Sequence, residues 1–134
     1  MKKLNIFLIA ALILVTVTQC NQKTEKITGI WQLQSMTING TLLQGNALGN
    51  WLWEFNDKGG YLSDIAGIKE KGLYKIKDNK LTLQPVGEKA HAQQTYTIEK
   101  LDSLEMTLSA VGGGNKSILR FLKTQAEGVQ GDKD

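Results

Sequence analysis

The chain has 134 residues, with 16 Lys and Arg against 13 Asp and Glu, and 41% of its residues are hydrophobic. This length and composition are typical of one folded domain and exclude a disordered or collagen-like chain. A single cysteine and a single histidine exclude an intramolecular disulfide framework and a Cys-rich zinc site. We therefore expect a protein that holds no metal or cofactor, has no catalytic residues and is not an enzyme.

The first segment has the pattern of a secretion leader. Lys2 and Lys3 precede an apolar run from Leu4 to Val17, which is shorter than a membrane-spanning helix needs. Cys20 follows the run after Thr18 and Gln19, and this arrangement resembles the lipobox of bacterial lipoproteins, although Gln19 stands where Ala, Gly or Ser is usual. The resemblance implies that residues 1–19 are a signal peptide and that Cys20 carries a diacylglycerol anchor. It places the protein at the cell envelope, most simply at the outer membrane; the alternative is an exported protein with a free thiol.

The charge of the exported part is nearly balanced. Without Lys2 and Lys3, 14 basic and 13 acidic side chains remain, and they form no block of one sign. Nothing in this balance favours a nucleic-acid partner. Residues 20–26 are polar and are expected to tether the lipid to the domain that follows.

From Ile27 the hydrophobic residues recur with period two in short runs, separated by Gly, Asn and Asp, which is typical of an all-β barrel or sandwich. A first run, 27–38, ends at the turn dipeptide Asn39-Gly40. Residues 41–50 are expected to form a short helical lid or a loop. Two further runs, 51–55 and 61–68, are followed by a predicted turn at 69–71.

The second half of the chain continues the pattern. Runs 72–77 and 80–85 flank Asp78-Asn79, a candidate two-residue hairpin turn, and the remaining runs are 94–101, 104–110 and 117–123. No helical stretch is long enough for a parallel crossover. Eight such runs predict an all-β fold, an eight-stranded antiparallel up-and-down barrel, because closure removes exposed edges. The tail, 124–134, is expected to be disordered.

A family resemblance rests on Gly29-Ile30-Trp31 at the first run and on the cadence GIWQLQS, WEFNDKGGY, GLYKIKDNKLTL, YTIEKLDSLEMTL and ILRFLK. It resembles the small lipocalin-like lipoproteins of the Bacteroidetes, over residues 27–123. The resemblance implies that Gly29 and Trp31 close the base of the barrel and that Arg120 packs over the Trp31 ring.

An eight-stranded barrel can be filled by side chains or can hold one small ligand. If Trp31 points inward, Thr37 shares its face; the candidate ligand-lining residues are Leu33, Ser35, Trp53, Phe55, Tyr74, Tyr96, Met106 and Phe121. One hypothesis is a barrel that binds a small hydrophobic molecule. The other is a filled barrel that contacts an envelope protein, as an inhibitor or immunity protein would.

Two segments imitate catalytic or phosphate-binding motifs. Glu88 and His91 lie in a polar loop without a second His or Cys to complete a metal site. Residues 112–117 are rich in glycine but lack the glycine positions of a phosphate-binding loop. We interpret both segments as solvated loops.

Overall fold

The computed structural model describes residues 23, 26–87 and 92–125. The predicted signal peptide, Cys20, His91 and the end of the tail lie outside these residues. Within them, Lys26 and Ile27 form a helical turn. The elements that follow are β1 (Gly29–Ile38), β2 (Thr41–Gln44), η1 (Gly45–Ala47), β3 (Trp51–Phe55), β4 (Gly60–Ile65), β5 (Ile68–Lys77), β6 (Lys80–Pro85), β7 (Gln94–Leu101), β8 (Glu105–Gly112) and β9 (Asn115–Thr124).

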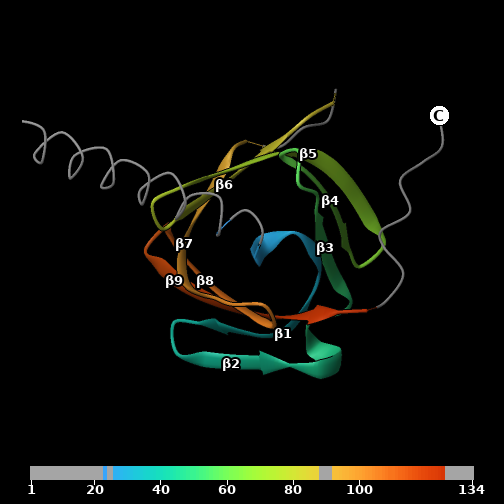
Figure 1. Ribbon diagram of the computed structural model, residues 1–134. Coiled ribbons are helices and arrows are strands. Elements are labelled where there is room, and N and C mark those ends of the chain that lie inside the picture. Colours follow the sequence, from blue (N-terminus) through green and yellow to red (C-terminus); the bar gives the residue numbers. More distant parts are fainter. Residues whose placement is uncertain (1–22, 24–25, 88–91, 126–134) are drawn as a thin grey trace, which may run out of the picture.

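The strands form one antiparallel sheet that closes on itself. From β3 to β9 each strand pairs with the next, β1 pairs with β3, and β9 returns to pair with β1. Strands β1 and β3 to β9 therefore form the ring that Figure 1 shows, with β2 outside it. The predicted eight-stranded antiparallel barrel is confirmed, and its closure leaves no long unpaired edge.

β2 is the strand that the sequence pattern did not predict. One edge of β1 serves two partners, because residues 29–32 pair with β3 and residues 35–38 pair with β2. Asn39-Gly40 forms the predicted turn between β1 and β2, with φ angles of 50° and 85°. The segment expected to be a lid or a loop is thus a short strand followed by the 3-10 turn η1.

The turn between β4 and β5 also differs from the prediction. It lies at Ala66-Gly67, where both φ angles are positive, and not at residues 69–71, which belong to β5. The Asp64 carboxylate accepts a hydrogen bond from the Gly67 N–H at 2.9 Å, and this contact stabilises a turn that the alanine makes hard to predict. As a result β5 is ten residues long, and Glu70 is part of a strand.

A β-bulge in β1 changes which side chains face inward. The register with β9 shifts between Leu33 and Ser35, so that Leu33 pairs with Phe121 but Ser35 pairs with the outward-facing Arg120. Beyond the bulge it is Met36 that packs against the core. The expectation that Ser35 and Thr37 line the interior is therefore wrong, because one extra residue reverses the alternation.

The connections alternate between the two ends of the barrel. We call one end the base: it holds the start of β1 and the turns after β3, β5 and β7. We call the other end the mouth: it holds the turns after β1, β4 and β8 and the connection between β6 and β7. The start of the described chain, blue in Figure 1, lies inside the ring, and Ile27 there is fully buried.

Candidate ligand site inside the barrel

The base is closed by Trp31 and the turn that precedes β1. Trp31 is fully buried, and its indole N–H donates a hydrogen bond to the Ile27 carbonyl at 2.7 Å. The Lys123 ammonium lies 5.1 Å from the centre of the Trp31 ring and also donates to the Lys26 carbonyl at 3.3 Å. Gly29 makes room for this lysine, since a Cβ there would stand 2.8 Å from Lys123 Cε. Gly29 and Trp31 thus occupy the base, as the resemblance implies.

Arg120 does not pack over Trp31, and that expectation is wrong. It alternates with the buried Leu119 and Phe121, so its side chain points to the outer surface and is 47% exposed. There its Nε donates to Glu105 Oε1 at 2.9 Å. The guanidinium lowers the pKa of the Glu105 carboxyl below its ordinary value, with Lys100 as a second cause. The cation over the indole is Lys123, three residues later in β9.

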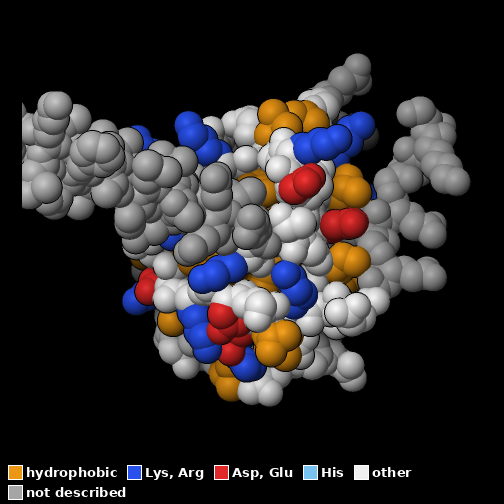
Figure 2. All heavy atoms as spheres, viewed as in Figure 1, with side chains coloured by type: hydrophobic (Ala, Val, Ile, Leu, Met, Phe, Trp, Pro, Cys, Tyr) orange, Lys and Arg blue, Asp and Glu red, His pale blue; other side chains and the backbone are white. Residues whose placement is uncertain are grey.

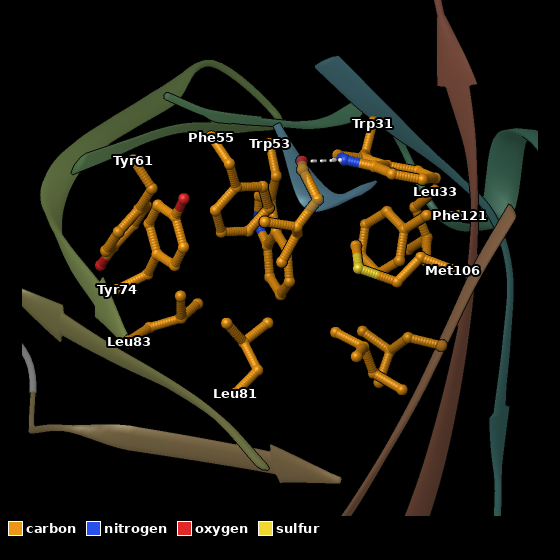
Figure 3. Close-up of a cluster of buried hydrophobic side chains, with 13 residues drawn as sticks. Trp31, Leu33, Trp53, Phe55, Tyr61, Tyr74, Leu81, Leu83, Met106 and Phe121 are labelled. Atoms are coloured by element: carbon orange, nitrogen blue, oxygen red, sulfur yellow. Dashed lines mark hydrogen bonds between the residues drawn. The ribbon is translucent and has the colours of Figure 1, made fainter. Parts of the chain in front are cut away.

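Above the base an aromatic cluster fills the barrel. Trp53 is at its centre: its ring stacks on Phe121 with centroids 4.7 Å apart and meets Phe55 and Tyr96 edge to face at 6.0 and 5.7 Å. Phe55 in turn meets Tyr74 at 5.1 Å. Figure 3 shows the rings of Trp53, Phe55, Tyr74 and Phe121 converging from β3, β5 and β9 toward Leu81, Leu83 and Met106. Such edge-to-face and offset pairs stabilise the core beyond the area that they bury.

Toward the mouth, inward-facing side chains stay partly exposed. Trp51 shares the inward face of β3 with Trp53, and Met36 shares the inward face of β1 with Leu33, yet both are only half-buried. The same holds for Ile65 on β4 and Ala110 on β8. Solvent therefore reaches inward-facing apolar surface at this end, where a hydrophobic ligand would gain from covering it.

A polar cluster lies between the aromatic cluster and the mouth. The Tyr61 hydroxyl donates to Glu70 Oε1 at 3.1 Å, and the Tyr96 hydroxyl donates to Gln94 Oε1 at 2.9 Å. Burial raises the pKa of Tyr61 and of Tyr96, and the negative charge of Glu70 raises both further. In the strands that the structure describes, the interior thus combines apolar walls with tyrosine hydroxyls and the carboxylate of Glu70.

Gly72 allows this arrangement. It pairs with Tyr61 across β4 and β5, and a Cβ there would stand 2.7 Å from the Tyr61 ring and 2.3 Å from the Gln84 carbonyl. Because Gly72 lacks a side chain, the Tyr61 ring can lie across β5. Its hydroxyl then reaches Glu70, two residues before the glycine.

Seven of the eight predicted lining residues face the interior. They are Leu33, Trp53, Phe55, Tyr74, Tyr96, Met106 and Phe121; all are buried or half-buried, and Ser35 is the exception. Tyr61, Ser63 and Glu70 are among the inward-facing residues that were not predicted from the sequence. The sequence did contain a sign that Glu70 faces inward. In the run IKEKGLYKIK it is separated from Tyr74 and Ile76 by an even number of positions, so all three lie on one face of the strand, whereas the neighbouring lysines lie on the other face.

A concave feature lies on the outer surface of β5, β6 and β7. It is a groove of about 620 Å³, and its lining includes the outward-facing Leu73, Lys75, Lys77, Lys80, Thr82 and Thr95. In the face that Figure 2 shows, basic and acidic side chains are interspersed over the surface. The lining of the groove is richer in lysine and threonine than the interior, although Tyr74 contributes to both.

Within the described residues no three His, Cys, Asp or Glu side chains come close enough to hold a metal ion. Glu88 and His91 lie outside those residues. Across the ranges 26–87 and 92–125, no helix has the length and apolar character to cross a membrane.

Comparisons with known proteins agree with this architecture. Residues 27–108 match the model of the lipocalin-like domain. A lipocalin-like protein from Bacteroides uniformis has 20% sequence identity and a TM-score of 0.56, over 71% of this chain and 97% of that one. An uncharacterized protein from Bacteroides eggerthii has 18% identity and the same TM-score, over 73% of this chain and 99% of that one.

At these identities the structural likeness shows the fold alone, and a search of curated proteins found no match. The family model covers more than half of the chain, from the buried turn before β1 to the middle of β8. The chain belongs to the lipocalin-like domain family.

Proposed function

We propose that the barrel binds a small hydrophobic molecule, which enters at the mouth and rests on the aromatic cluster. The observation that carries this proposal is the half-buried, inward-facing apolar surface of Met36, Trp51, Ile65 and Ala110. Water in contact with such surface is released when an apolar ligand covers it. Membership of the lipocalin-like family supports the same function.

The test uses the mature chain, residues 20–134, with Cys20→Ser so that no lipid is attached. This chain includes every described residue. A fluorescent apolar probe should bind with a defined stoichiometry and quench tryptophan fluorescence, because Trp51 and Trp53 face the interior.

A matched pair of variants locates the binding. Ala110 faces inward near the mouth, while the next residue, Val111, faces outward and is 78% exposed. Ala110→Phe should abolish binding and Val111→Phe should leave it unchanged, with both variants folded by circular dichroism. Binding that survives Ala110→Phe in a folded protein would place the probe outside the barrel and reject the proposal.

We also propose that Cys20 is lipidated and holds the barrel at the cell envelope, at the outer membrane. Support comes from the sequence, where a charged pair and an apolar run end at this cysteine. In the native host, a fatty-acid probe should label the wild-type chain and not the Cys20→Ala variant. Equal labelling of both proteins would refute lipidation at this residue.

A second candidate function is contact with an envelope protein. The outer groove favours it, because Leu73 is 58% exposed there beside Lys75, Lys77 and Lys80, an arrangement that suits an acidic protein surface. If the apolar probe does not bind at the mouth, this second function becomes the better interpretation. Charge reversal at Lys75 and Lys77 should then weaken the association with a protein co-purified from the native host.

A further inference from the structure

We propose that Glu70 selects the polar end of the ligand, favouring a cationic or hydrogen-bond-donating head group and rejecting a carboxylate or phosphate. This inference rests on the proposed function, since it needs a ligand inside the barrel. It assigns the ligand class as an apolar body that ends in an amine or a hydroxyl.

The position of Glu70 carries the first step. It pairs with Ser63, which is 4% exposed, and it shares the inward face of β5 with Gly72 and Tyr74. Its Oε1 accepts the Tyr61 hydroxyl at 3.1 Å, and its charge acts on Tyr96 across the barrel. The carboxylate therefore lies inside the barrel, between the aromatic cluster and the mouth.

The distribution of the other charges carries the second step. Lys69 and Lys71 flank Glu70 in sequence, but strand alternation directs both to the outer surface, where they are exposed. The pairing of the described strands gives the side of the sheet that each charged residue faces. Only Glu70 and Lys123 among these residues face the interior. Lys123 lies over Trp31 at the base, the opposite end of the barrel. Within the described strands, Glu70 is thus the one charged residue that strand register places on the mouth side of the interior.

The chemistry of the carboxylate carries the third step. An ionised carboxylate only accepts hydrogen bonds, and its two oxygens accept several at once, so the hydrogen bonds that Glu70 makes within the protein are compatible with a further donor from a ligand. A ligand ammonium or hydroxyl supplies such a donor. A ligand carboxylate supplies none and adds a like charge in a partly desolvated site, which is costly.

The experiment compares three ligands with the same ten-carbon tail: decylamine, decanol and decanoate, each below its micelle concentration at neutral pH. Affinity is measured by displacement of the fluorescent probe from residues 20–134 with Cys20→Ser. We expect decylamine to bind at least about tenfold more tightly than decanoate, because close like charges disfavour binding strongly. Decanol should bind with intermediate affinity.

Two variants make the result specific. Glu70→Gln keeps the shape and an acceptor for Tyr61 but removes the charge, so the ratio of amine to acid affinity should fall to near one. Glu54→Gln removes the same charge from the outward face of β3 and should leave the ratio unchanged. If Glu70→Gln does not fold, the wild-type ratio decides alone.

The outcomes separate this inference from the proposed function. Decanoate binding as tightly as decylamine, or a ratio unaffected by Glu70→Gln in a folded protein, would overturn the role of Glu70. If decanol still bound and Ala110→Phe still blocked it, the binding function itself would stand. No binding of any of the three ligands would overturn both.

Discussion

The two ends of the barrel use the same strands for different purposes. At the base and in the aromatic cluster directly above it, Trp31, Phe55, Met106 and Phe121 are buried to 1% exposure or less. Toward the mouth, Met36 and Trp51 also face inward but remain half-buried. The inward-facing side chains above the aromatic cluster also include Glu70, which accepts a hydrogen bond from the Tyr61 hydroxyl. The base is a packed core, whereas the mouth side has partly exposed apolar surface and polar groups.

One barrel can thus combine a stable core at one end with the proposed ligand site at the other. Burial of large side chains at one end supplies most of the hydrophobic stabilisation. The other end can then carry groups that a packed core excludes, such as Glu70, which are tolerated there because they are hydrogen-bonded. Substitutions at the base should therefore affect stability most, and substitutions at the mouth should affect binding most.

Truncation of a base aromatic should have the largest effect. Phe121 is fully buried and stacks on Trp53, so Phe121→Ala should lower the free energy of unfolding by about 3 to 5 kcal/mol. Trp51→Ala, at the mouth, should cost less, about 1 to 2 kcal/mol, because part of that side chain is already exposed. Urea denaturation measures both. Equal losses would contradict the division into a packed base and an accessible mouth.

The next largest effect is expected at Gly72, where the base and the mouth meet. Gly72→Ala places a methyl group against the Tyr61 ring and the Gln84 carbonyl and should cost about 1 to 3 kcal/mol through overpacking. Gly112→Ala in β8 serves as the control, because a Cβ at Gly112 would meet no atom within 4 Å and the φ angle there is not positive. The urea midpoint of the Gly112 variant should be unchanged or slightly raised. A Gly72 variant as stable as the control would contradict the close approach of Tyr61.

Most of the fold could be predicted from the sequence because period two, turn dipeptides and closure act together. Asn39-Gly40 and Asp78-Asn79 both lie where the hairpin turns form. Two predictions were wrong at places where the residue types do not mark the local backbone conformation. Ala66 adopts a positive φ that alanine rarely takes, and the bulge near Ser35 adds one residue without a glycine or proline to mark it.

The site was harder to predict because it depends on which strands are neighbours. Arg120 has the residue type expected over Trp31, but alternation between Leu119 and Phe121 turns it outward, and Lys123 takes that place. The inward position of Glu70 was not predicted because residues 69–71 have the composition of a polar turn. Once residues 69–71 are assigned to a strand, the alternation of side chains along that strand places the Glu70 carboxylate inside the barrel.

Titration of the tyrosines tests whether their hydroxyls are shielded from water inside the barrel. All three tyrosines of the chain, Tyr61, Tyr74 and Tyr96, face the interior, and burial raises the pKa of each above the ordinary value of about 10. The unfolded chain therefore loses these protons at lower pH than the folded one. Stability from this source is constant below about pH 10 and falls as pH rises above it.

Ultraviolet absorbance of tyrosinate, in native protein and in urea, measures the two titrations. The native curve should lie at higher pH than the unfolded curve. Glu70→Gln should lower the native pKa of Tyr61 and Tyr96 and leave that of Tyr74 unchanged, because Glu70 acts only on the first two. Coincident native and unfolded curves would show that the hydroxyls are not desolvated.

The smallest effect is expected from the inward-facing charge at the base. A cation over an indole contributes about 0.5 to 1 kcal/mol when partly exposed, so Lys123→Gln should lower stability by about that amount and Lys123→Arg should restore most of it. Arg120→Gln breaks an exposed ion pair with Glu105, which can cost a similar amount, so single variants do not distinguish the two cations.

A double-mutant cycle distinguishes Lys123 from Arg120, because it isolates the energy that two residues share. Combined with Trp31→Phe, the Lys123 substitution should show a coupling of about 0.5 kcal/mol or more, and the Arg120 substitution should show none. Coupling of Trp31 to Arg120 instead would restore the arrangement that the family resemblance implied and would leave Lys123 as a surface residue.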